Sequence, residues 1–103
     1  MAAIARGKEA DTVASPDGTG PKCALPTIQA TEQCSSNVLI NGIGIVRAGD
    51  YMKHHPGPGC GDHAPTLTSF SSTVKVNGKG VGRVGDDYAG HVITSGSGNG
   101  NCG

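Results

Sequence analysis

The sequence predicts an all-β fold built from short β-hairpin repeats with pseudo-threefold symmetry. Three observations predict it: internal repeats, Asn-Gly pairs placed between strand-like runs, and a content of glycine and proline that disfavours helices. Gly provides 18 and Pro 6 of the 103 residues, and no segment keeps a helical hydrophobic period over three turns. A chain of this length forms one small domain, which we assign to residues 1–103.

The repeats are visible when the chain is aligned with itself. Residues 35–50 and 71–86 are identical at nine of sixteen positions, at an offset of 36. Residues 3–6 align with the middle of these copies, and residues 94–97 align with the segment just before the second copy. The two ends of the chain therefore supply the two halves of a third repeat, so that the three repeats close on themselves.

Each full repeat predicts a hairpin. Asn41-Gly42 and Asn77-Gly78 separate two runs rich in β-branched residues, and both residues of such a pair tolerate the positive φ of a type I′ turn. Loops dense in Pro and Gly, residues 15–26 and 54–65, connect the hairpins.

An arginine recurs once in every repeat. This recurrence favours a structural role, such as bonding loop carbonyls or a nearby carboxylate. In the alignment Glu9 occupies the place of the aspartates that follow the second and third arginines. The positions concerned are Arg6 with Glu9, Arg47 with Asp50, and Arg83 with Asp86.

Composition limits the function. Eight basic residues balance eight acidic ones, which removes the basic face that nucleic-acid binding requires, so we expect no nucleic-acid partner. Aromatic residues make up only 3% of the chain. A small domain with so few large apolar side chains needs a disulfide, a metal or a partner for its stability. Residues 1–7 lack the apolar stretch of a secretory signal, which predicts synthesis in a reducing cytoplasm and favours a metal over disulfides.

The segment 53–63 concentrates metal-ligating residues. Zinc binds four nitrogen or sulfur ligands in a tetrahedron. His55 and His91 each lie five residues after a Gly-Asp pair, which predicts equivalent positions around the pseudo-threefold axis. We predict a zinc site formed by His55, Cys60, His63 and His91. Four protein ligands leave no open coordination position, so the expected zinc is structural.

Alternatives to this ligand set remain open. His54 adjoins one proposed ligand, and Cys102 is a rival to Cys60. Cys23 and Cys34 could form a disulfide or remain as buried thiols. No Ser, His and Asp residues form a catalytic pattern, and a zinc hydrolase would need an open metal position, so no catalytic residue is assigned and no enzyme is expected.

The motifs Arg47-Ala48-Gly49-Asp50 and Arg83-Val84-Gly85-Asp86, each preceded by an Asn-Gly hairpin, resemble those of the PAAR-repeat proteins. Arg6 belongs to the weaker copy, and none of the copies keeps the letters Pro-Ala-Ala-Arg. The resemblance covers nearly the whole chain.

The resemblance implies a small cone that caps the trimeric β-helical spike of a contractile injection machine, one copy per trimer. The spike would be a VgrG-like protein of a type VI secretion system or the central spike of a phage tail. It also implies apical zinc held by three His and one Cys, and puncture of a target outer membrane by a non-enzymatic spike-tip protein. The chain would be made in the cytoplasm, then assembled on the virion or secreted with the spike. A small zinc-binding adaptor that recruits a toxin to the spike is the alternative.

Overall fold

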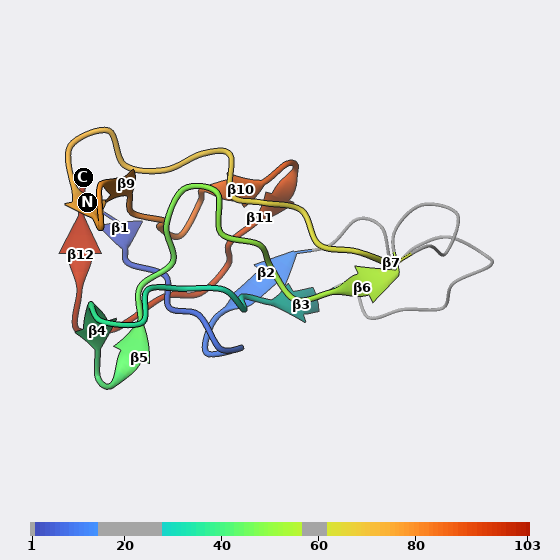
Figure 1. The fold of residues 1–103 in the computed structure, drawn as a ribbon, viewed down its shortest axis with the longest axis horizontal. Coiled ribbons are helices and arrows are strands. Elements are labelled where there is room, and N and C mark those ends of the chain that lie inside the picture. The colour runs from blue at the N-terminus through green and yellow to red at the C-terminus, as the bar shows by residue number, and fades with distance from the viewer. Residues whose placement is uncertain (1, 15–27, 57–61) are drawn as a thin grey trace.

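The described part of the chain contains twelve strands of two or three residues each. The computed structural model describes residues 2–14, 28–56 and 62–103, and within these residues it contains no helix, so none that could span a membrane (Figure 1). The strands pair two by two as antiparallel two-stranded sheets, all called hairpins below although β1 and β12 are not consecutive in the chain: β1 (Ala2–Ala3) with β12 (Asn101–Cys102), β2 (Thr12–Ala14) with β3 (Ile28–Ala30), β4 (Leu39–Ile40) with β5 (Ile43–Gly44), β6 (His55–Pro56) with β7 (Asp62–His63), β8 (Lys75–Val76) with β9 (Lys79–Gly80), and β10 (Asp87–Tyr88) with β11 (His91–Val92).

The hairpins form two groups at opposite ends of the described part of the molecule, which we call the body (Figure 1). We call the end formed by β1–β12, β4–β5 and β8–β9 the base, and the end formed by β2–β3, β6–β7 and β10–β11 the apical end. The all-β, hairpin-repeat prediction is confirmed. The shape and the pairing agree with a small cone.

The predicted Asn-Gly turns are present in the base. Asn41 and Gly42 have φ of 53° and 79°, and Asn77 and Gly78 have φ of 55° and 77°. These values are the left-handed conformations that a two-residue type I′ turn requires. The third base hairpin pairs Ala2 with Cys102, so the segments at the two ends of the chain complete it, as the alignment predicted.

A ring of backbone hydrogen bonds joins the three repeats at the centre. The amide of Ala5 donates to the carbonyl of Gly82 over 2.9 Å, Gly82 donates to Val46 over 2.9 Å, and Val46 donates back to Ala5 over 3.1 Å. These three residues hold equivalent places in the three repeats, and all are buried. These three hydrogen bonds close a ring, so the three repeats are arranged with pseudo-threefold symmetry.

Isolated β-bridges repeat the same cycle one step outward. Each bridge pairs the arginine of one repeat with the β-branched residue two places before the arginine of the next repeat. The pairs are Arg6 with Ile45, Arg47 with Val81, and Arg83 with Ile4. Every repeat therefore contacts both others through its backbone.

Two hydrophobic clusters fill the body. The larger cluster lies between the central ring and the apical hairpins, and the smaller one lies under the base. The larger cluster contains Ala5, Val13, Val46, Met52, Leu67, Tyr88 and Ile93, and the smaller contains Ile45, Val76, Val81 and Cys102. Thr31 occupies the position of Leu67 and Ile93 in its repeat, and its hydroxyl donates to the carbonyl of Arg6, which satisfies a polar group in the core.

Tyr88 supplies the largest buried side chain, and its hydroxyl has no hydrogen-bond partner within the described residues. Burial, followed by the nearby carboxylates of Asp50 and Asp11, raises the pKa of this phenol well above its ordinary value. A buried hydroxyl without a partner costs about 1–3 kcal/mol. The side chain therefore contributes packing while its polar atom opposes folding.

We expect Tyr88→Phe to raise the free energy of unfolding by about 1 kcal/mol, because the substitution removes only the unpaired hydroxyl. Chemical denaturation at neutral pH measures this change, with Tyr51→Phe as the control at a half-buried site, expected to stay within about 0.5 kcal/mol. A loss of 1 kcal/mol or more in Tyr88→Phe would show that the hydroxyl has a partner.

Candidate functional site

Each repeat arginine is bound by an aspartate. Arg47 donates from its backbone N–H and its Nε to one carboxylate oxygen of Asp50, both over 2.9 Å, and from Nη2 to the other over 3.0 Å. Arg83 and Asp86 repeat this geometry at 2.8–2.9 Å. The bidentate geometry fixes the turn that follows each arginine. The predicted structural role of the arginines is confirmed.

The prediction that Glu9 is the carboxylate of the first repeat is wrong. Asp11 binds Arg6, accepting its backbone N–H over 2.7 Å and its Nη2 over 3.2 Å. Two extra residues in this repeat, Lys8 and Glu9, adopt positive φ of 53° and 63° and shift the carboxylate along the chain. Glu9 instead forms a surface ion pair with Lys53 at 2.8 Å.

Burial and hydrogen bonding act in opposite directions on the carboxylate of Asp86. Burial would raise its pKa, but hydrogen bonds from the Arg83 side chain, from the Ser69 hydroxyl and from the Arg83 amide lower it below the ordinary value. The same contact with Asp86 raises the pKa of the Arg83 guanidinium. The carboxylate of Asp86 therefore stays ionised and keeps its ion pair with Arg83.

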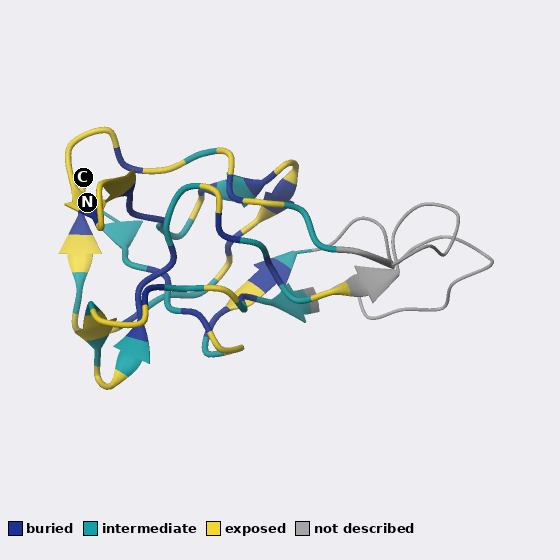
Figure 2. Cartoon of the chain, viewed as in Figure 1, coloured by how far each residue is buried: buried dark blue, intermediate teal, exposed yellow. Residues whose placement is uncertain are grey.

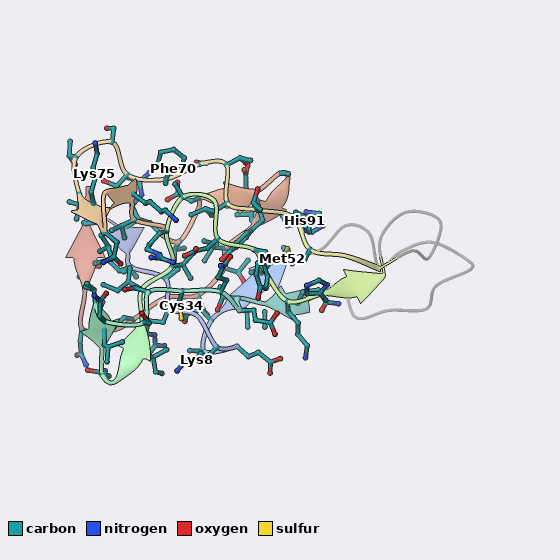
Figure 3. The ribbon with its side chains drawn as sticks, in the orientation of Figure 1. Lys8, Cys34, Met52, Phe70, Lys75 and His91 are labelled. Atoms are coloured by element: carbon teal, nitrogen blue, oxygen red, sulfur yellow. The ribbon has the colours of Figure 1, made fainter. Side chains whose placement is uncertain are left out.

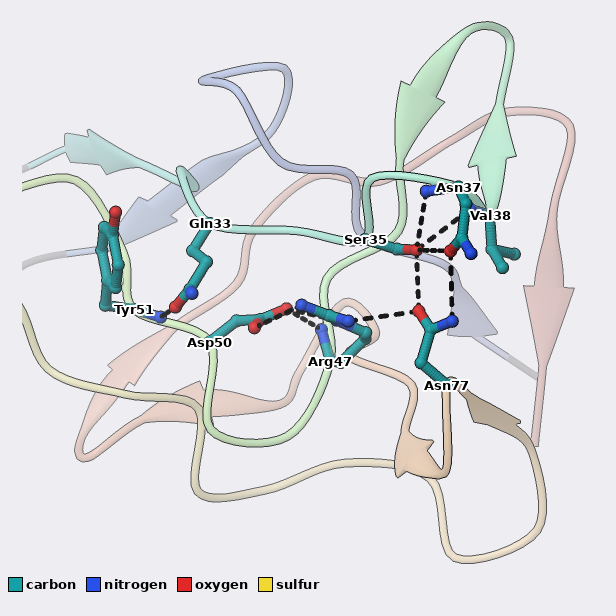
Figure 4. Close-up of polar contacts among 8 residues, drawn as sticks. All are labelled: Gln33, Ser35, Asn37, Val38, Arg47, Asp50, Tyr51 and Asn77. Atoms are coloured by element: carbon teal, nitrogen blue, oxygen red, sulfur yellow. Dashed lines mark hydrogen bonds and ion pairs between the residues drawn. The ribbon is translucent and has the colours of Figure 1, made fainter.

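A buried serine in each repeat was not singled out from the sequence. The hydroxyl of Ser35 accepts the backbone N–H of Asn37 and of Val38, over 3.3 and 3.0 Å, and it contacts Oδ1 of Asn77 at 2.8 Å (Figure 4). Arg47 donates to the same Asn77 oxygen over 3.1 Å. These bonds link the β4–β5 hairpin to the turn of the β8–β9 hairpin.

Ser71 and Ser97 occupy the same place in the other two repeats. Each is 1% exposed, and each accepts backbone N–H groups two or three residues ahead. The recurrence of serine at these three aligned positions is the signal from which this role could have been read.

At the apical end, the register of β6 and β7 places His55 directly opposite His63. Directly opposed residues in an antiparallel pair have Cβ atoms about 4.5–5.5 Å apart, close enough for two imidazoles to share one ion. This juxtaposition concerns the backbone only, because the side chains of both residues and the whole of Cys60 lie outside the described part of the structure.

His91 begins β11 and is paired with Tyr88 across a two-residue turn. Its side chain is buried, and Figure 3 shows it at the end of the body from which β6–β7 projects. Nδ1 lies 3.0 Å from the carbonyl oxygen of Tyr88. A carbonyl only accepts, so Nδ1 carries a proton in this contact; a neutral imidazole with its proton on Nδ1 is the tautomer that binds a metal through Nε2.

The predicted equivalence of His55 and His91 is wrong in detail. His55 lies on the outgoing strand of its hairpin, whereas His91 lies on the returning strand of a much shorter one. Ala89 and Gly90, with φ of 53° and 99°, reverse the chain before the count of five residues is complete. The two histidines belong to neighbouring apical hairpins without being related by the repeat.

The alternative ligands are placed as follows. His54 is exposed and packs its ring against Tyr51, with the ring centroids 5.5 Å apart at 70°. Cys102 is buried in β12, at the base, and is therefore separated from the apical histidines by the length of the body. Cys34 and Cys102 are free thiols, so Cys34 forms no disulfide, and Cys23 lies outside the described residues.

No group of three metal-ligating side chains occurs within the described residues, among which His91 is the one proposed ligand whose side chain is placed. The zinc site therefore remains a prediction. Comparison with known proteins assigns no family: no family model matches the chain, and no curated protein is significantly similar to it.

Proposed function

We propose that this chain is a non-enzymatic spike-tip protein of the PAAR-repeat type, which caps the trimeric β-helical spike of a contractile injection machine. The observation that carries the proposal is the cyclic backbone ring of Ala5, Val46 and Gly82, which gives one chain a threefold-repeated framework. A monomer with this framework matches a threefold partner at one copy per trimer.

The base supports the same proposal. A trimeric β-helix ends in three exposed strand edges, which are prone to pair with other chains. The base presents three hairpins around one axis, each of them a separate two-stranded sheet with edges of its own. One copy of the chain can therefore cover three equivalent edges at once, with β1–β12, β4–β5 and β8–β9 each facing one subunit.

The apical end would be held by zinc bound to His55, Cys60, His63 and His91, whose chemistry suits zinc. When bound, zinc would supply a cross-link between the apical hairpins. Two features of this chain fit a zinc ion: the pairing of His55 opposite His63, and the contact of His91 Nδ1 with the Tyr88 carbonyl. A rigid, narrow end is what puncture of an outer membrane requires of a spike, in a phage virion or in a type VI secretion system.

The test is the stoichiometry of a complex with a spike. Native mass spectrometry of the purified chain, mixed with recombinant β-helical ends of a VgrG-type and of a phage central-spike protein, should show one chain per trimer with at least one of the two. Equimolar assemblies, or no assembly with either end, would contradict the proposal. A trimeric coiled coil of similar mass serves as the control for non-specific association.

A further inference from the structure

The base has a charge distribution that differs from the rest of the molecule. The segments that build it, residues 2–5, 35–46, 71–82 and 97–103, contain no Asp or Glu. Their charged side chains are Lys75 and Lys79, and both belong to the β8–β9 hairpin. The side-chain charge of the base is therefore positive and is confined to one of its three hairpins.

Lys75 and Lys79, like Lys8, make no ion pair within the described residues, whereas the described arginines and Lys53 do. The three arginines bind aspartates, and Lys53 pairs with Glu9. Lys75 and Lys79 are exposed and make no ion pair within the described part of the chain. No internal role explains their position at the very end of the body, where Figure 3 shows Lys75.

Apolar side chains accompany the lysines. Leu39 is 50% exposed on β4, and Val74, which precedes β8, is 37% exposed. Figure 2 shows exposed residues along the strands at this end of the body. Leu39 and Val74 offer apolar contact, and the two lysines offer positive charge, to a protein that docks on the base.

We propose that the base docks onto a protein end whose contact surface is apolar and carries an acidic side chain that meets Lys75 and Lys79. The inference rests on the proposed function and adds the chemistry of the partner. The occupant is a protein because two lysines on a chain of zero net charge are too few for binding to a phosphate backbone.

The confinement of charge to one hairpin has a consequence for binding to a trimer. A threefold partner presents its acidic side chain three times around the axis. Lys75 and Lys79 meet one of these copies, while the β4–β5 and β1–β12 hairpins contribute no charged side chain to the other two. The affinity therefore depends on one or two ion pairs, and its dependence on salt is shallow.

The test measures the binding of the wild type and of a charge-reversed variant to spike ends with and without acidic residues. The probes are the recombinant β-helical ends used above, each with its native acidic residues at the blunt end and with those residues changed to Asn or Gln. Biolayer interferometry measures Kd at low and at high salt. We expect the double variant Lys75→Glu with Lys79→Glu to weaken binding to the acidic end by about 10- to 100-fold. Lys8→Glu is the control, because Lys8 is exposed and lies outside the segments that build the base.

Restored binding of the double variant to an end whose acidic residues are changed to Lys would support the pairing directly. Unchanged Kd in the double variant, with wild-type binding equal on acidic and neutral ends, would overturn the inference and leave the proposed function standing. Failure of the wild type to bind any end would overturn the proposed function and this inference together. Circular dichroism of each variant excludes misfolding as the cause of lost binding.

Discussion

Purified protein should contain about one zinc ion per chain, and removal of that zinc should lower the midpoint of thermal unfolding by at least about 10 °C. The reason is that the ion would join the β6–β7 hairpin to β11 at the apical end, so that removing it would break a cross-link between two hairpins. Elemental mass spectrometry measures the zinc, and calorimetry with and without a chelator measures the stability. His63→Ala and His91→Ala should each lose the metal.

His54→Ala is the matched control for the zinc prediction, because His54 is exposed and adjoins a proposed ligand. It should keep its zinc and its stability. Cobalt substituted for zinc adds a test of Cys60, since a thiolate ligand gives a charge-transfer absorption that Cys60→Ala should lack. Full zinc retention in His63→Ala and His91→Ala would show that the ligand set is wrong.

The second large effect is expected at Asp11. Asp11→Ala should lower the free energy of unfolding by about 3 kcal/mol, because it removes three hydrogen bonds from Arg6 and one from the Ser95 hydroxyl in a largely buried place. Glu9→Ala should change it by less than about 0.5 kcal/mol, because the Glu9–Lys53 pair is exposed. Urea denaturation of both variants measures the difference.

The Asp11 and Glu9 variants separate two views of the first repeat. If Glu9→Ala were the more destabilising substitution, the alignment of Glu9 with Asp50 and Asp86 would be right and the ion pair of Arg6 with Asp11 would be incidental. An Asp50→Ala variant gives the scale of the effect, because Asp50 makes the equivalent contacts in the second repeat.

The hairpins and their circular closure could be predicted from the sequence because they depend on local, repeated chemistry. Asn-Gly at the turns determines the base hairpins, and nine identities in sixteen positions identify the repeat. The alignment also predicted that the two ends of the chain form the third hairpin. Pairing of Ala2 with Cys102 confirms it.

The apical end was less predictable because its hairpins differ in length. The alignment relates residues by their number along the chain, whereas the position of a side chain at this end depends on where its hairpin turns. Ala89 turns at positive φ without the usual Asn, so the count that related His55 to His91 failed there. Lys8 and Glu9 displaced the first carboxylate in the same way, through two residues at positive φ that no turn motif announced.

The cyclic backbone ring also governs the order of folding. Ala5 bonds to Val46 and to Gly82, and Ile4 accepts from the amide of Ser97, so the first strand finds its partners only when distant parts of the chain are present. Closing such long loops costs conformational entropy before any of these contacts forms. Residues 2–5 therefore take up their native pairing only after residues 82 and 97–102 have come into place.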